Sequence, residues 1–145
     1  MEMEEFAAYQ TWANSITLEV LRGAGIEEAN SAFAHVLAAN LVWGNRLAGK
    51  APDCTVRPSW DLTACEEAIT QIANLYHSLP KDLRNETVIE YTTSTGTASS
   101  STVAQIMRQL WVHNAYHRGE IAGYIRNSGG TVPDTDYIIF ARAAR

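Results

Sequence analysis

The segment from Glu27 to Leu47 constrains the fold most, because it is apolar on nearly every side. On a helix with about 100° between successive residues, His35 shares one face with Ala39, Val42 and Trp43, and the opposite face carries Phe33, Leu37 and Leu41. One face can meet the core of a bundle, and the other can meet a neighbouring helix or a second subunit. A helix with this pattern must be covered on both sides, so the chain needs several other elements around it.

Three other segments have helical periodicity. Apolar residues recur at three- and four-residue steps from Glu4 to Arg22, and Gly23 and Gly25 are suited to ending that helix. A third helix begins at a cap on Asp61 or Thr63 and stops before Pro80, and a fourth begins at the capping box of Thr102–Gln105 and runs to Asn127.

A short β-hairpin is predicted between the third and fourth helices. Thr87–Thr93 is rich in β-branched residues and alternates in polarity, and Ser94–Gly96 provides a turn. The stretch from Lys50 to Trp60 is predicted to be a loop, and the apolar group Tyr137–Phe140 is expected to pack back on the helices. The sequence therefore predicts an all-α fold, a four-helix bundle with a small hairpin, forming one domain over residues 1–145.

Composition narrows the classes of function. The formal net charge is −5, which argues against a protein that binds nucleic acid. The acidic start lacks the features of a secretory signal, and no stretch of 18 apolar residues predicts a membrane span. Cys54 and Cys65 lack the spacing of a zinc or redox pair, with Cys65 expected in the core and Cys54 in a loop. A cytoplasmic protein without nucleic-acid or membrane partners is expected.

Two histidines lie on the inward stripe of the fourth helix. His113 and His117 are four residues apart, and the stripe continues through Ile121 and Tyr124. Such a pair places two imidazoles side by side, close enough to bind one cation. The alternative is a pair of hydrogen-bonded core histidines, but a buried polar ring costs free energy unless a partner satisfies it.

His35 strengthens the metal interpretation, because it lies on the inward face of the second helix, where it can reach the same level of the bundle. Three neutral imidazoles without a protein carboxylate leave coordination positions open, which is typical of a catalytic site rather than a structural one. The sequence therefore predicts a divalent metal on His35, His113 and His117. His77 falls in the last turn of the third helix, where it suits the helix dipole and needs no metal.

These residues also carry a resemblance to a known family. His35 is followed by Trp43 and Arg46 on one helix, then by HNAYHRGEIAGYIRNSGG over residues 113–130 and PDTD over residues 133–136. Nearly the whole chain resembles the DinB/YfiT-like proteins, which are bacterial four-helix metalloproteins. Glu120 stands where that family often has Gln.

The resemblance implies an up-down-down-up bundle, a nickel or zinc ion on His35, His113 and His117, and a homodimer. Characterised relatives include thiol transferases that use bacillithiol or mycothiol, a thiol-linked isomerase and a hydrolase, and many members have no assigned activity. The leading hypothesis is thus a metal-dependent thiol S-transferase, in which a bound cation keeps a small-molecule thiol in its nucleophilic thiolate form.

Several alternatives remain open at this point. Water on the metal could serve a hydrolase, the metal could be non-catalytic in a binding or interaction bundle, or His35 and one other histidine could hold haem. The catalytic residues are unknown. Glu120 could orient a ligand or accept a proton, although as a charged residue it is expected to be solvated. Arg46 could meet a substrate carboxylate, and Trp43 could wall the pocket or belong to the core.

Overall fold

The computed structural model describes residues 3–143. Along the chain these form α1 (Met3–Ala24), α2 (Glu27–Leu47), α3 (Leu62–His77), β1 (Val88–Thr92), β2 (Ala98–Thr102), α4 (Val103–Asn127) and α5 (Tyr137–Ala143). The predicted helical bundle with a small hairpin between the third and fourth helices is confirmed.

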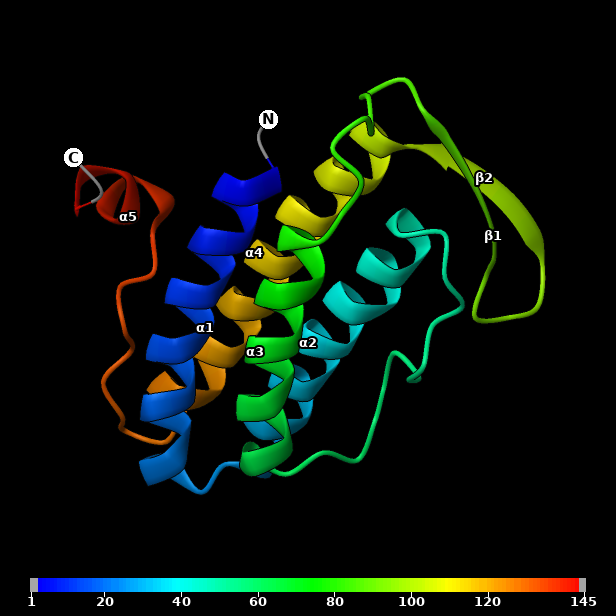
Figure 1. The fold of residues 1–145 in the computed structure, drawn as a ribbon. Helices are drawn as coiled ribbons and strands as arrows, with labels where there is room; N and C mark the ends of the chain where they lie inside the picture. The colour runs from blue at the N-terminus through cyan, green and yellow to red at the C-terminus, as the bar shows by residue number, and fades with distance from the viewer. Residues whose placement is uncertain (1–2, 144–145) are drawn as a thin grey trace.

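The four long helices form an up-down-down-up bundle, as the resemblance implies. In Figure 1, α1 and α4 run in one direction and α2 and α3 in the other. α1 packs mainly on α3, α3 on α2, and α2 on α4. The short link between α1 and α2 makes those helices antiparallel, whereas the long connection after α2 crosses the length of the bundle and allows α3 to run parallel to α2.

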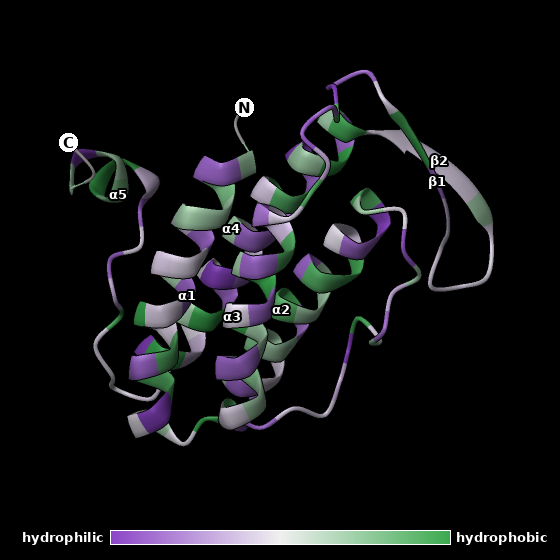
Figure 2. Ribbon diagram, viewed as in Figure 1, coloured by the Kyte–Doolittle hydropathy of each residue, from purple (hydrophilic) through white to green (hydrophobic). Residues whose placement is uncertain are grey.

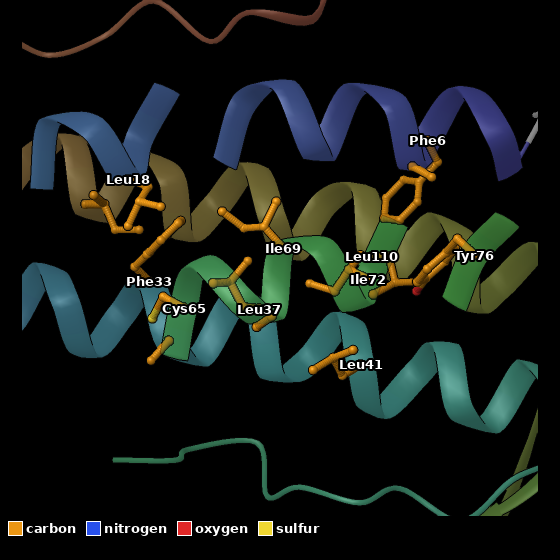
Figure 3. Close-up of a cluster of buried hydrophobic side chains, with 14 of the residues drawn as sticks. Phe6, Leu18, Phe33, Leu37, Leu41, Cys65, Ile69, Ile72, Tyr76 and Leu110 are labelled. Carbon is orange, nitrogen blue, oxygen red and sulfur yellow. The ribbon is translucent and has the colours of Figure 1, made fainter. Parts of the chain in front are cut away.

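The core lies between the four helices. Figure 3 shows side chains from each of them meeting there, with Phe6 and Tyr76 near one end and Leu18 and Phe33 near the other. Cys65 is fully buried in this cluster, as predicted. Hydrophilic residues lie along the outer sides of α1 and α3 (Figure 2). α2 has buried residues on most of its surface, which matches its apolar pattern.

Local signals set the helix ends. The side chain of Asp61 accepts a hydrogen bond from the Ala64 amide at 2.8 Å, so Asp61 rather than Thr63 caps α3. The predicted capping box between Thr102 and Gln105 is present at the start of α4. Gly23 lies inside α1 instead of ending it, and α1 stops before Gly25, whose φ of +63° suits glycine.

The hairpin is attached to the end of α2. The guanidinium of Arg46 lies 4.4 Å from the centre of the Trp43 ring and 4.6 Å from that of Tyr91, and it donates a hydrogen bond to the Thr92 carbonyl at 2.8 Å. These contacts combine cation–π attraction with a charge-assisted hydrogen bond. Arg46 and Trp43 therefore have a structural role in holding β1 (Val88–Thr92) against the bundle.

The C-terminal segment packs back on the bundle, as predicted, but it does so as a short helix that the sequence pattern did not predict. Tyr137 and Phe140 of α5 contact an aromatic group on α1 and α4 that contains Tyr9, Trp12 and Trp111.

Within residues 3–143, none of the helices is both long enough and apolar enough to cross a membrane.

Candidate metal centre

Three histidines from two helices converge inside the bundle. His35 lies on the inward face of α2, and His113 and His117 lie one turn apart on α4, the antiparallel neighbour of α2. One ring nitrogen from each residue lies within 4.8 Å of those of the other two. The structure thus brings together all three residues that the sequence predicts as metal ligands.

The spacing of the rings suits one small ion. The Nε2 atoms of His35 and His113 are 3.1 Å apart. Neighbouring nitrogens on one cation are about 3.0–3.4 Å apart when the metal–nitrogen bonds measure about 2.0–2.1 Å. The three ring centroids are 4.5–5.0 Å from one another, which leaves no space for a planar macrocycle between any two of them. This geometry excludes the haem alternative.

Hydrogen bonds orient two of the rings. Nδ1 of His35 lies 2.5 Å from the Val56 carbonyl oxygen, and because a carbonyl can only accept, Nδ1 carries the proton. Nδ1 of His117 lies 2.7 Å from Oε2 of Glu120, which likewise accepts. In the neutral form of each ring the lone pair is therefore on Nε2, as a metal ligand requires. Nδ1 of His113 is buried and has no partner among the described residues.

Burial favours the neutral form of His35 and His113. Burial, together with the nearby charges of His117 and His35, lowers the pKa of His113 to about 4. Burial also lowers the pKa of His35, although the hydrogen bond to Val56 opposes that shift. Neutral imidazole is the form that binds metal ions. The three imidazole donors and the hydrogen-bonded Nδ1 atoms of His35 and His117 together fit a divalent cation.

A pair of buried amides fixes α2 against α4 beside the triad. Asn40 and Asn114 are both fully buried, and each donates to the side-chain oxygen of the other, at 3.0 and 3.1 Å. Nδ2 of Asn40 also donates to the Val36 carbonyl. Because Asn114 follows His113 directly, this reciprocal pair sets the level at which α4 presents its histidines to α2.

Two residues of the triad, His35 and His117, border an open pocket of about 400 Å³ between α2 and α4. Its lining comprises Glu27, Glu28, Ser31, Ala32, His35, Arg57, His117, Glu120 and Tyr124. His35 itself is only 8% exposed, so the pocket reaches a ring that is otherwise enclosed by protein. A cation on the triad would consequently be accessible to small molecules from this side.

The loop between α2 and α3 closes one wall of the pocket. It runs back along α2, with Asn45 near Asp53, the Ala38 carbonyl near Cys54, and His35 bonded to Val56. This path brings Arg57 over the first half of α2. Arg57 and the Val56 carbonyl are parts of the site that were not predicted from the sequence. The length of a loop does not determine where it crosses a helix.

Other residues singled out from the sequence lie elsewhere or take different roles. Trp43 and Arg46 contact the hairpin. Neither residue lines the pocket beside the triad. His77 lies in the last turn of α3, as predicted, and is not one of the converging ligands. Glu120 is exposed at the surface, as expected of a charged residue, but it also orients His117.

An up-down-down-up helical bundle with three convergent histidines beside an open pocket defines a class of proteins able to hold a metal ion. The model of the DinB family matches residues 2–145, so the chain belongs to the DinB family. Neither a curated protein nor a solved structure matches this chain significantly.

Proposed function

We propose that this protein is a metal-dependent thiol S-transferase that holds nickel or zinc on His35, His113 and His117. The observation that carries the proposal is the triad of convergent imidazoles, two of which line an open pocket, in a chain of the DinB family. The resemblance stated above, in which characterised relatives transfer thiols, supports the choice of reaction.

The residues of this chain would provide the site and its orientation. His35, His113 and His117 hold the ion, and the Val56 carbonyl and Glu120 keep the Nε2 lone pairs of His35 and His117 directed at it. A bound divalent cation supplies the positive charge that favours the thiolate of a substrate over its thiol. The pocket is open to a thiol and to an electrophile, and as the thiolate sulfur bonds to the electrophilic carbon, the leaving group on that carbon would depart with the bonding electron pair.

A metal-dependent hydrolase is the second candidate. It is favoured by the carboxylate of Glu120, which lines the pocket next to His117 and could accept a proton from water. The same carboxylate is already bonded to a ligand ring, so its orienting role supports either reaction. A non-catalytic metal-binding bundle is the third candidate and predicts binding without turnover.

Activity assays on untagged protein separate these candidates. Protein reloaded with nickel or zinc is mixed with a thiol and 1-chloro-2,4-dinitrobenzene, and separately with p-nitrophenyl acetate. Thiol transfer that a chelator abolishes and that His117→Ala lacks would support the proposal. His77→Ala provides a matched control, because His77 is the remaining histidine and lies outside the triad.

Each other result has a definite meaning. Ester hydrolysis without thiol transfer would replace the proposal with the hydrolase. A stoichiometric metal that supports neither reaction would favour the non-catalytic bundle.

The homodimer stays a prediction. Light scattering tests it, because a dimer has a mass of about twice the 16.0 kDa of the chain.

A further inference from the structure

Each histidine that α4 contributes to the triad is followed directly by a buried polar residue that bonds to another helix. Asn114 follows His113 and is bonded to α2, whereas Arg118 follows His117 and is bonded to α1. The third histidine lies on α2, which runs antiparallel to α4 (Figure 1). The contact of Asn114 therefore connects the two helices that hold the triad.

Apolar packing alone does not determine the register of α4 along α2. Apart from His35 and Asn40, the buried residues of α2 have apolar side chains or none. The attraction between apolar surfaces has no direction, so such helices can pack in more than one register. A slip of one residue moves a side chain by about 1.5 Å along the helix axis, whereas metal–ligand distances tolerate only about 0.2 Å. A metal site shared by two helices therefore needs a contact that selects one register.

The amides of Asn40 and Asn114 provide such a contact. Both side chains are fully buried, and each donates a hydrogen bond to Oδ1 of the other. A slip of α4 would separate them and leave the amide of Asn114 buried without its partner, which costs free energy. The Tyr76 hydroxyl donates to the Asn40 carbonyl at 3.2 Å, so α3 holds this part of α2 in place. The hydrogen bonds of the pair are thus satisfied in one register of α2 and α4.

We infer that Asn40 and Asn114 are positioning residues for the metal centre, because their reciprocal hydrogen bonds select the register of α2 and α4 in which the three imidazoles converge. The role toward a metal rests on the proposed function, whereas the register can be measured without a metal. The pair contributes specificity of register more than stability. Exchange of both amides for apolar side chains leaves neither of them buried without a partner and can leave stability unchanged or raise it.

Nuclear magnetic resonance of the metal-free protein tests the register directly. The ring centroids of His35 and His113 are 5.0 Å apart, so nuclear Overhauser contacts between these rings and one set of imidazole resonances are expected. Asn40→Leu combined with Asn114→Leu removes both amides and keeps branched side chains. This double variant should lose the ring contacts or show several sets of imidazole resonances. Asn40→Ala combined with Asn114→Ala adds no volume to the core and should have the same effect.

Metal binding provides the second measurement. Both double variants should bind nickel and zinc about ten- to hundredfold more weakly than the unmodified protein, the range for loss of groups that orient metal ligands. Cobalt(II) in place of these ions reports the ligand geometry through its visible absorption, and the shape of that spectrum should change. A pair that only stabilised the bundle would lower the midpoint of chemical denaturation and leave the cobalt spectrum of the folded protein unchanged.

Single variants and a matched control separate the pair from burial of an amide in general. Asn40→Leu or Asn114→Leu alone leaves the other amide without its partner, so each should unfold at a lower denaturant concentration than the double leucine variant. Asn14 is also a buried asparagine, but it lies on α1, and its Oδ1 has no hydrogen-bond partner among the described residues. Asn14→Leu should leave the ring contacts, the metal affinity and the cobalt spectrum unchanged.

The inference and the proposed function fail in different ways. Ring contacts and a cobalt spectrum that stay unchanged in both double variants would overturn the inference, and metal-dependent thiol transfer by the same variants would leave the proposed function intact. If the unmodified protein binds neither nickel, zinc nor cobalt, the proposed function is wrong. Loss of the ring contacts in the double variants would then still support the selection of register by the two amides.

Discussion

At the scale of single residues, the two nitrogens of each imidazole have separate tasks. Nδ1 of His117 is bonded to Glu120, whose other oxygen lies 3.5 Å from the Tyr124 hydroxyl. Nδ1 of His35 is bonded to a main-chain carbonyl, which no side-chain substitution removes. Glu120 is therefore the orienting group that mutation can test.

Replacing Glu120 with Ala should weaken nickel or zinc binding about tenfold, the lower end of the range for loss of a group that orients a ligand. Glu120→Gln retains an acceptor oxygen for Nδ1 of His117 and should have a smaller effect. Competition with a chromophoric chelator measures both affinities. Glu90→Ala serves as the control, and an unchanged affinity in Glu120→Ala would show that Glu120 does not orient His117.

The residues of the triad were predictable, whereas their surroundings were not. His113 and His117 share a helical stripe, and the inward face of α2 contains His35, so periodicity alone identifies them. Val56 and Arg57 reach the site through a loop that carries no periodic signal. The pairing of Asn40 with Asn114 depends on how α2 and α4 are aligned, which the pattern of either helix does not contain.

At the scale of elements, α2 and α3 approach closely at Gly44. A Cβ atom there would lie 2.6 Å from Cδ2 of Leu75 and 2.9 Å from Cε2 of Tyr76, whose side chain is fully buried. Gly44→Ala should therefore lower the free energy of unfolding by about 1–3 kcal/mol, despite the higher helix propensity of Ala. Chemical denaturation measures this change.

Gly123→Ala is the matched control for Gly44→Ala. Gly123 is also helical, but a Cβ atom there would meet no other heavy atom within 4 Å. Helix propensity alone then applies, and the variant should be up to about 1 kcal/mol more stable. Equal effects at the two glycines would contradict the close approach of α2 and α3.

The C-terminal segment is held to the bundle through a buried arginine. Arg118 is 8% exposed and donates to Oε1 of Gln10 at 2.8 Å and to the Tyr9 hydroxyl at 2.9 Å. The Tyr9 hydroxyl in turn donates to the Thr135 carbonyl at 2.8 Å. This chain of hydrogen bonds connects α4, α1 and the segment before α5, so its removal should affect both stability and docking of the tail.

Arg118→Ala should lower the free energy of unfolding by about 2–4 kcal/mol, because it leaves two buried acceptors without donors and removes packing. Tyr9→Phe removes only the hydroxyl and should lower it by about 1–2 kcal/mol. As a control, Lys81→Ala breaks an exposed ion pair with Glu4 and should change stability by less than about 1 kcal/mol. If Arg118→Ala lowers the free energy of unfolding no more than Lys81→Ala does, the hydrogen bonds of Arg118 do not stabilise the fold.

At the scale of the whole molecule, the order and direction of the helices could be predicted only in part. Periodicity and caps locate the four long helices, and the short link after α1 requires an antiparallel pair. A long connection permits either direction, so the parallel course of α2 and α3 depended on the family resemblance. Helix α5 was missed because its stability comes from aromatic contacts with Tyr9 and Trp12 rather than from its own short sequence.

Because the ligands come from α2 and α4, a metal on the triad links two helices and should stabilise the entire bundle. A cation that binds only the folded chain, present at about 100 times its Kd, adds about 2.7 kcal/mol, which corresponds to a rise in Tm of roughly 10 °C for a chain of this size. Differential scanning fluorimetry of metal-free protein, with and without added nickel or zinc, measures the shift.

The decisive comparison is the metal-induced shift, measured against the metal-free form of each variant. His35→Ala and His113→Ala each alter stability on their own, but the rise on adding metal should fall by more than half, since two ligands bind far more weakly than three. His77→Ala, outside the triad, should keep the full rise. A rise that persists in both triad variants would place the metal elsewhere in the molecule, and the thiol chemistry proposed for this pocket would lose its basis.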